Sequence, residues 1–199
     1  MELLFASSNK HKIEEIQQCL HNMYSIKGLS DLGFTDEIPE DATTLEGNAL
    51  LKARFMYNRW GKACFADDTG LEVEALNGKP GVYSARYSGS LADFSGNEKL
   101  RTQANKDKLL LQLTDKENRK AQFRTVIAYI EKNKEYLFEG IVTGTIAKQE
   151  LGEAGFGYDP LFIPDGYHTS FAQMTIEQKN RISHRARATA KFIDWLKTR

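Results

Sequence analysis

The order of apolar segments along the chain is the feature that most constrains its fold. Short apolar runs at residues 1–6, 24–29 and 63–66 predict strands, and the segments between them carry apolar residues at helical spacing. Further on, β-branched and aromatic residues dominate 122–130 and 135–146, which predicts a long antiparallel hairpin. A βαβα start followed by a hairpin favours an α/β fold with a mixed sheet and flanking helices.

Sequence motifs also indicate where the helices begin. The first helix is expected over 10–20 and the last over 185–197. Capping boxes predict three more helices: Thr43-x-x-Glu46 begins a helix that ends near 60, Ser95-x-x-Glu98 begins one that ends near 113, and Thr175-x-x-Gln178 begins a short one. Residues 77–90 and the glycine-rich 152–157 are expected to be loops. No linker separates independent domains, so we expect residues 1–199 to form one domain, with a second lobe formed by the hairpin.

Charge and cysteine content exclude several functions. The chain has 27 basic and 27 acidic residues, so no net field attracts nucleic acid or an anionic membrane. Cys19 and Cys64 form no C-x-x-C pair and are too few for a disulfide scaffold, which fits a reducing compartment. The first 20 residues lack an apolar signal segment, and no apolar run reaches the roughly 18 residues of a spanning helix. We expect a cytoplasmic protein with no nucleic-acid or membrane partner.

A polar segment, Ser7-Ser8-Asn9-Lys10-His11-Lys12, lies between the first predicted strand and the first helix. Backbone N–H groups at a helix N-terminus favour an anion such as a phosphate, and Ser7, Asn9 and Lys12 could add donors. The alternative is plain helix capping by Ser8 or Asn9.

An acidic loop follows the second predicted strand. Residues 28–51 contain no lysine or arginine but hold Asp31, Asp36, Glu37, Glu40, Asp41 and Glu46. Carboxylates without counter-charges suggest Mg²⁺, which prefers oxygen ligands and shares substrate phosphates, and Glu40-Asp41 is the candidate pair. A solvated acidic loop is the commoner explanation of such a pattern.

Two adjacent carboxylates, Asp67 and Asp68, come directly after the strand predicted at 63–66. Burial of an unpaired carboxylate is costly, so this position suggests a function. On an extended backbone the two side chains point to opposite faces, and one would serve a site while the other holds the loop. The alternative is a strand end followed by a turn at Thr69-Gly70.

A fourth cluster combines Gly155-Phe156-Gly157-Tyr158-Asp159-Pro160 with Lys179, Ser183, His184 and Arg185. Phe156 between glycines could offer a ring for a base to stack on, and His184 and Arg185 could donate to base oxygens or phosphates. Alternatively, Phe156 is a core aromatic and the basic run is a solvated helix face. Together the four clusters would suit a nucleoside triphosphate.

These residues also resemble those of the Ham1-like inosine triphosphate pyrophosphatases. The similar segments follow the family's order over residues 3 to about 190, and the two most specific are the block from Asp67 to Tyr87 and the Phe156-Gly157-Tyr158-Asp159-Pro160 motif. The others are Ala6 to Lys12, the acidic loop leading to Asn48-Ala49, and Ser183-His184-Arg185.

The resemblance implies an elongated mixed sheet with two lobes around a cleft, usually in a homodimer. It also implies Mg²⁺-dependent hydrolysis of ITP, dITP and XTP to the monophosphate and pyrophosphate. By the same resemblance, Ser7, Ser8, Asn9, Lys10, His11 and Lys12 would hold the triphosphate, Glu40 and Asp68 the metal, and Thr69 the substrate nearby. Asp68 would also accept a proton, with Asp67 a weaker candidate. Phe156, Gly157, Tyr158, Asp159, Lys179, His184 and Arg185 would surround the base and phosphates.

The sequence departs from the family pattern at three places. Thr69 replaces the usual serine but keeps the hydroxyl, Leu45 and Gly47 stand within the T-F-x-E-N-A pattern, and Ala186 replaces a glycine near the base. Two other hypotheses remain: a pyrophosphatase for other modified nucleotides, such as methylated pyrimidine triphosphates, and a nucleotide-sensing or RNA-binding module without catalysis. Tyr83 and Tyr87 suit either a dimer surface or ordinary core packing.

Overall fold

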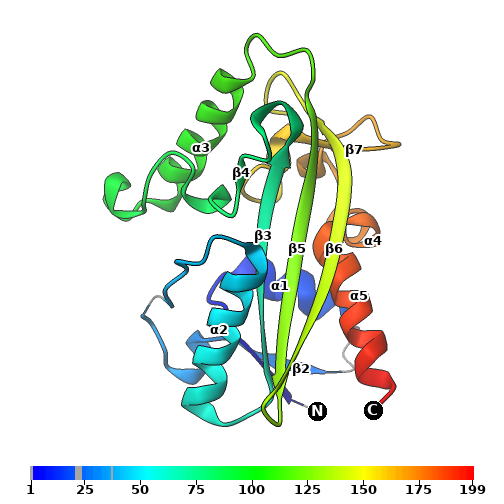
Figure 1. Ribbon diagram of the computed structural model, residues 1–199. Helices are drawn as coiled ribbons and strands as arrows, with labels where there is room; N and C mark the ends of the chain where they lie inside the picture. Colours follow the sequence, from blue (N-terminus) through cyan, green and yellow to red (C-terminus); the bar gives the residue numbers. More distant parts are fainter. Residues whose placement is uncertain (1, 21–23, 37) are drawn as a thin grey trace. The chain divides into compact units, whose positions relative to one another are not determined.

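The computed structural model describes residues 2–20, 24–36 and 38–199 of the chain. The predicted strand residue Met1 and the acidic-loop residue Glu37 lie outside this part. The strands are β1 Glu2–Phe5, β2 Ser25–Lys27, β3 Cys64–Val73, β4 Pro80–Gly81, β5 Lys120–Glu131, β6 Lys134–Ile146 and β7 Phe162–Pro164 (Figure 1). The α-helices are α1 Lys10–Cys19, α2 Leu45–Trp60, α3 Glu98–Gln112, α4 Ile176–Ile182 and α5 His184–Lys197.

The described strands form one mixed sheet in the order β2-β1-β3-β5-β6-β7, with β4 paired to β3. β1 runs parallel to both β2 and β3, whereas β4 is antiparallel to β3 and β7 is antiparallel to β6. The expected α/β class with a mixed sheet is therefore confirmed. The chain divides into two compact units: the first unit comprises residues 1–68, 125–141 and 180–199, and the second comprises 69–124 and 142–179.

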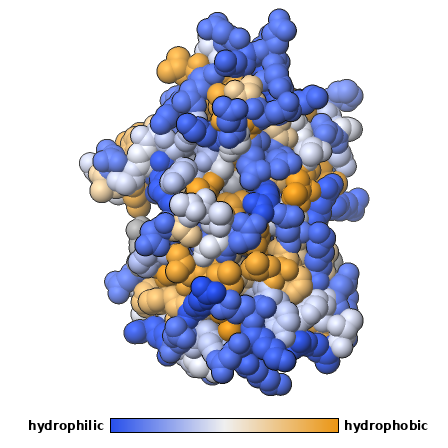
Figure 2. Space-filling model, in the orientation of Figure 1, coloured by the Kyte–Doolittle hydropathy of each residue, from blue (hydrophilic) through white to orange (hydrophobic). Residues whose placement is uncertain are grey.

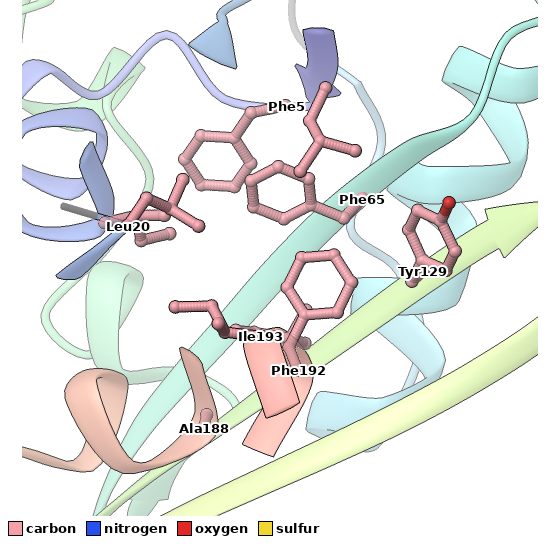
Figure 3. Packing of buried hydrophobic residues seen from close by; sticks show 10 residues of the cluster. Phe5, Leu20, Phe65, Tyr129, Ala188, Phe192 and Ile193 are labelled. Carbon is pink, nitrogen blue, oxygen red and sulfur yellow. The ribbon is translucent and has the colours of Figure 1, made fainter. Parts of the chain in front are cut away.

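Aromatic and aliphatic side chains form the core of the first unit (Figure 3). Phe5 of β1 stacks on Phe65 of β3 with ring centroids 4.5 Å apart, and Phe192 of α5 lies 5.3 Å from Phe65. Ile16 of α1 and Leu20, the residue that caps the C-terminal end of this helix, belong to the cluster, as the apolar spacing predicts. Each large aromatic ring removes much apolar area from water, so this cluster fixes α1 and α5 against the strands.

Two of the helix starts differ from the predicted capping boxes. Thr44, not Thr43, caps α2, because its hydroxyl accepts the Gly47 N–H at 3.1 Å. Asn97 caps α3 and Ser95 does not, since Ser95 has a left-handed backbone with φ 51° that ends the preceding turn. In both cases a neighbouring residue with equal capping ability has the extended backbone that a cap requires.

The expected start of the short helix α4 is confirmed. The Thr175 hydroxyl accepts the Gln178 N–H at 3.2 Å, while the Gln178 amide oxygen accepts the Thr175 N–H at 2.9 Å. The hairpin is also confirmed, since β5 and β6 are joined at Lys132 and Asn133. Both turn residues have positive φ, at 50° and 58°, which is the two-residue geometry that suits the twist of hairpin strands.

Strand β3 is longer than predicted. It continues through Asp67, Asp68 and Thr69 to Val73, so the expected end of the strand near Ala66 and the turn at Thr69-Gly70 are wrong. Pairing with β4 explains the extension, because Leu71 faces Gly81 and Glu72 faces Pro80 across the antiparallel ladder. The two aspartates therefore lie within a strand.

The second unit has its own aromatic core. Phe123 of β5 lies 4.8 Å from Phe162 of β7, and Phe162 lies 5.2 Å from Phe171, measured between ring centroids. The segment 77–90 is ordered around Ser84, whose hydroxyl accepts the Leu71 N–H at 2.8 Å and donates to Gly81. The expectation of an ordered loop here is confirmed.

Polar residues dominate the face of the molecule that Figure 2 shows, and apolar residues appear between them in smaller groups. The large apolar side chains that remain exposed are Tyr83, Leu100, Leu111, Leu137 and Tyr167. Within residues 2–20, 24–36 and 38–199, no helix has the length and apolar character needed to cross a membrane.

Candidate active site

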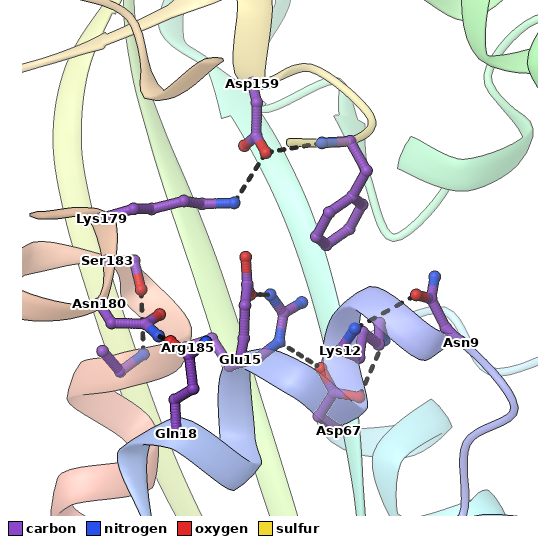
Figure 4. A network of polar contacts seen from close by, with 12 residues as sticks. Asn9, Lys12, Glu15, Gln18, Asp67, Asp159, Lys179, Asn180, Ser183 and Arg185 are labelled. Carbon is purple, nitrogen blue, oxygen red and sulfur yellow. Dashed lines mark hydrogen bonds and ion pairs between the residues drawn. The ribbon is translucent and has the colours of Figure 1, made fainter. Parts of the chain in front are cut away.

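Asp67 lies between two cations in the first unit (Figure 4). The ammonium of Lys12, on α1, lies 2.8 Å from Oδ1, and Nε of Arg185, on α5, lies 3.2 Å from Oδ2. The side chain of Asp67 is only 1% exposed. Burial alone would raise the pKa of this carboxyl, but Lys12 and Arg185 hold it well below its usual range. Asp67 is therefore ionised at neutral pH and held in place by two ion pairs.

Arg185 continues this network to a second carboxylate. Its Nη1 donates to Glu15 of α1, and both side chains are buried. Burial would lower the pKa of Arg185, but Glu15 and Asp67 raise it beyond its ordinary value. The network thus ties the start of α5 to α1 and β3 through charged hydrogen bonds.

Asp68, the next residue of β3, has a different environment. Its Oδ2 is buried and has no hydrogen-bond partner among the residues that the structure describes, while Oδ1 lies 3.6 Å from Nζ of Lys52. Burial raises the pKa of Asp68 above its ordinary value, although Lys52 lowers it in part. Asp68 thus carries a buried acceptor atom that can serve a ligand.

Lys52 of α2 connects Asp68 with the acidic loop. Its Nζ lies 2.5 Å from Oε1 of Glu40, and its side chain is 8% exposed. Burial would lower the pKa of Lys52, but the charges of Asp68 and Glu40 raise it, so the lysine is charged. One turn earlier on α2, Asn48 accepts the Ala42 N–H at 3.0 Å and holds the end of the acidic loop to the helix.

The Glu40 and Asp68 carboxylates fit a magnesium ion. They supply only oxygen donors, and the buried Oδ2 of Asp68 is an acceptor that needs a partner. The described part of the chain has no group of three or more histidine, cysteine, aspartate and glutamate residues arranged for a metal. Two carboxylates suit Mg²⁺, which keeps several waters and shares substrate phosphates. Asp41, the other acid of the candidate pair, is exposed.

The polar segment Ser7 to Lys12, at the start of α1, both caps the helix and contributes to the ion-pair network. Asn9 is the cap, because its side-chain oxygen accepts the Lys12 N–H at 3.2 Å, and Ser7 accepts the Asn9 N–H at 3.2 Å. The capping alternative is confirmed for Asn9, whereas Ser8 is exposed, as are Lys10 and His11. Basic residues in a first turn oppose the helix dipole, so their presence favours an anion outside the protein.

In the second unit, Asp159 orders the predicted aromatic loop (Figure 4). Its Oδ2 accepts the Phe156 N–H at 2.9 Å and the Lys179 ammonium at 2.7 Å, and Asp159 and Lys179 are both buried. The ammonium also lies 4.9 Å from the centre of the Phe156 ring, a cation–π distance. Gly155 is required here, because with φ +75° a Cβ atom would come 2.3 Å from Oδ2 of Asp159.

Of the other predicted site residues, Tyr158 and His184 are buried, and Thr69 and Gly157 are half-buried. The hydroxyl of Tyr158 donates to the Ser84 carbonyl at 3.0 Å, so it joins two loops of the second unit. His184 is buried at the start of α5, where Ser183 caps the helix by accepting the Ala186 N–H at 3.1 Å.

Sequence reasoning assigned no role to three residues of these networks: Glu15, Asn48 and Lys52. Each is a polar residue on a helix face that also carries apolar core residues, and each is almost fully buried. Asn48 and Lys52 lie one turn apart within the apolar stripe of α2, which is a pattern that could have revealed them.

The fold and site define a mixed α/β protein with a buried carboxylate pair on its strand β3. The chain belongs to the Ham1 family, which matches residues 3–195. It is 53% identical over 197 residues to a Flavobacterium psychrophilum protein named dITP/XTP pyrophosphatase, covering 99% of this chain and 100% of that protein. A Porphyromonas gingivalis protein of the same name is 52% identical over 98% of this chain and 97% of its own.

Solved structures show the same fold. The Ham1 protein of Staphylococcus aureus is similar with a TM-score of 0.86 and 38% identity, covering 100% of this chain and 99% of that one. The HAM1 protein of Coxiella burnetii gives a TM-score of 0.87 at 32% identity, with 100% of both chains covered.

Proposed function

We propose that this chain is an Mg²⁺-dependent pyrophosphatase that hydrolyses dITP, XTP and ITP to the nucleoside monophosphate and pyrophosphate. The single observation that carries this proposal is the difference in partners between two neighbouring carboxylates. Both oxygens of Asp67 are paired with Lys12 and Arg185, whereas Asp68 presents a buried oxygen beside Lys52 and Glu40. The names of the relatives agree with it. We propose further that residues 1–199 act as one catalytic domain.

Glu40 and Asp68 are the proposed metal ligands. When bound, Mg²⁺ would neutralise phosphate charge and lower the pKa of water. Asp68 is also the proposed proton acceptor for the water that attacks the α-phosphorus, since its oxygen is buried and its pKa is raised by burial. The bond from the α-phosphorus to the bridging oxygen breaks, and pyrophosphate leaves.

The phosphates are assigned to the segment from Ser7 to Lys12. The N–H groups at the start of α1 and the side chains of Ser7, Asn9 and Lys12 can donate to phosphate oxygens, while Lys10 adds positive charge and His11 a ring N–H donor at the surface. Lys12 holds Asp67 as well, so its charge stabilises the site and the developing charge on the leaving group.

The base is assigned to Phe156 and its neighbours. The half-buried ring can stack on a purine, and the contact of its backbone with Asp159 fixes the loop that carries it. His184 and Arg185 are the proposed donors to the 6-oxo group, which hypoxanthine and xanthine have and adenine lacks. Because Arg185 already donates to Asp67 and Glu15, we expect it to contribute more by holding Asp67 than by contacting the base.

We also propose that the enzyme is a cytoplasmic homodimer. The free thiols of Cys19 and Cys64 fit a reducing compartment. Tyr83 is 51% exposed and has the Arg86 guanidinium 5.3 Å from its ring centre, so it suits a surface contact better than the core. Gel filtration with light scattering of the wild type and Tyr83→Asp tests this, and a monomeric wild type would contradict it.

Pyrophosphate release tests the activity. We expect Mg²⁺-dependent release from dITP, XTP and ITP and much slower release from ATP, GTP and dTTP. A preference for dTTP would instead indicate a pyrophosphatase for other nucleotides. Binding of dITP without turnover would indicate a nucleotide-binding module and would contradict the proposal.

A further inference from the structure

Lys52 occupies the position of a counter-cation between two carboxylates. Its ammonium lies 2.5 Å from Oε1 of Glu40 and 3.6 Å from Oδ1 of Asp68, and all three residues belong to the first unit. Lys52 and Asp68 are buried, so water screens these charges poorly. The ammonium therefore offsets a repulsion that would otherwise separate Glu40 from Asp68.

Among the cations described here, Lys52 is the one whose ammonium lies close to both Glu40 and Asp68. Lys12 contacts Asp67 at 2.8 Å, and Arg185 donates to Asp67 and Glu15, so both cations already have carboxylate partners. The net charge of Lys52, Glu40 and Asp68 together is one negative charge. This net charge attracts a further cation, while the ammonium of Lys52 repels it.

An ammonium and a divalent cation compete for the same oxygen atoms. Oε1 of Glu40 accepts a hydrogen bond from Lys52, and a metal ion that used this oxygen would lie close to the positive Nζ. Lysine has a flexible stem, so its head group can leave without unfolding α2. It needs a new anionic partner when it leaves, because a buried unpaired ammonium is costly.

We infer that Lys52 is the resident counter-cation of the Glu40–Asp68 pair and that it keeps Mg²⁺ binding weak until a phosphate group of the substrate gives its ammonium a new partner. This inference rests on the proposed role of Glu40 and Asp68 as metal ligands. This role of Lys52 makes metal binding and nucleotide binding cooperative, so the enzyme binds Mg²⁺ and the nucleotide together.

The positions of Glu40 and Asp68 do not depend on the ammonium of Lys52. Asp68 is fixed by the backbone of β3, and the loop that carries Glu40 is held by the hydrogen bond from Ala42 to Asn48. Neither anchor depends on Lys52. The carboxylates therefore keep their positions, and only the charge between them changes.

Metal binding without nucleotide tests the inference directly. Electron paramagnetic resonance with Mn²⁺ as the probe gives the affinity of the wild type and of Lys52→Met, Lys52→Gln and Lys52→Arg. We expect both neutral variants to bind Mn²⁺ at least about fivefold more tightly than the wild type, the lower end of a typical coupling between two sites. Lys52→Arg keeps the positive charge and should bind as weakly as the wild type.

Lys106→Met is the matched control. Lys106 is also a buried lysine paired with a glutamate, Glu150, but the pair belongs to the second unit. We expect its Mn²⁺ affinity to equal that of the wild type. Equal or weaker binding by both neutral Lys52 variants, with folding verified by circular dichroism, would overturn the inference, and so would tight binding by Lys52→Arg.

Thermal unfolding tests the link to phosphate. In the wild type, excess Mg²⁺ alone should change the melting temperature little, and Mg²⁺ with inorganic pyrophosphate should raise it. In Lys52→Met, Mg²⁺ alone should already raise it. If the wild type responds fully to Mg²⁺ alone, the cooperative part of the inference is wrong.

Pyrophosphate release from dITP by the wild type separates this inference from the proposed function. Mg²⁺-dependent release together with unchanged Mn²⁺ affinity in the Lys52 variants would reject the inference alone. Tighter Mn²⁺ binding by these variants without any pyrophosphate release from dITP would reject the proposed function. It would still support competition between Lys52 and a metal ion at Glu40 and Asp68.

Discussion

Asp67 and Asp68 are consecutive residues of β3, and their carboxylates meet different cations. Asp67 accepts from Lys12 and Arg185, while the Oδ1 atom of Asp68 lies 3.6 Å from Lys52. The pKa of Asp67 is lowered and that of Asp68 is raised. Two neighbouring acids thus have different tasks, because successive side chains of a strand point to opposite faces.

Asparagine substitutions should separate the two tasks. Asp67→Asn leaves Lys12 and Arg185 with a neutral partner and should cost about 3 kcal/mol of the free energy of unfolding, as the loss of one member of a buried ion pair does. Asp68→Asn removes both the ion pair with Lys52 and the repulsion with Glu40, so the two changes oppose each other and stability should change little, but kcat should fall about 100-fold or more. Urea denaturation and pyrophosphate release measure the two effects. A stable Asp67→Asn that alone has lost turnover would reverse the assignment.

Acid should remove the contribution of Asp67 to stability. Its pKa is lower in the folded chain than in the unfolded chain, so the stabilisation is complete above the unfolded pKa and is lost as the pH falls toward the folded one. The difference in unfolding free energy between the wild type and Asp67→Asn should therefore shrink from about pH 5 downward. Denaturation at a series of pH values measures it. A difference that stays constant down to about pH 2 would contradict the ion-pair explanation.

Gly140 of β6 permits the close approach of α5. A Cβ atom there would lie 2.0 Å from the His184 carbonyl oxygen and 2.4 Å from the Ala188 nitrogen, both backbone atoms of that helix. Gly140→Ala should shift the start of α5, which carries Arg185, and cost about 3 kcal/mol or more, at or above the usual range for overpacking. Thermal and chemical unfolding measure this cost.

Gly61→Ala is the control for this substitution. Gly61 has φ +64°, and its Cβ would meet no atom within 4 Å in the described part of the chain, so only backbone strain of about 1 kcal/mol is expected. Equal losses in the two variants would show that the approach of α5 does not require Gly140.

Phe156 should contribute to nucleotide affinity more than to folding. Its ring is half-buried, and Phe156→Ala should weaken dITP binding by about 1 to 3 kcal/mol, the usual contribution of a stacked base. Phe156→Trp keeps a stacking surface and should retain most of the affinity. KM and kcat for dITP measure the effect, and a loss confined to kcat would argue against stacking.

Asp159→Asn should act on the same loop through Lys179. The buried ion pair at 2.7 Å would be broken and the Phe156 N–H would lose a charged acceptor, so we expect a loss of about 3 to 5 kcal/mol in stability. Asp115→Asn, at an exposed acid of the same unit, serves as the control. If both variants unfold alike, the Asp159–Lys179 pair does not order the loop.

Local patterns in the sequence determined most of the elements. Apolar spacing predicted α1, and β-branched residues predicted the β5–β6 hairpin, because both signals depend on residues a few positions apart. The capping residues of α2 and α3 were missed by one or two positions, since several neighbours have equal capping ability. The end of β3 was missed because its extension depends on pairing with β4.

The sequence by itself also determined which chemical groups are available: the adjacent carboxylates, the basic start of α1 and the aromatic loop at Phe156. Only the tertiary structure decided how they are used. Asp67 meets Lys12 from 55 positions away and Arg185 from 118 positions away, and Lys52 meets both Glu40 and Asp68. Local sequence cannot specify such partners, because they depend on how distant segments pack and on which side chains that packing removes from water.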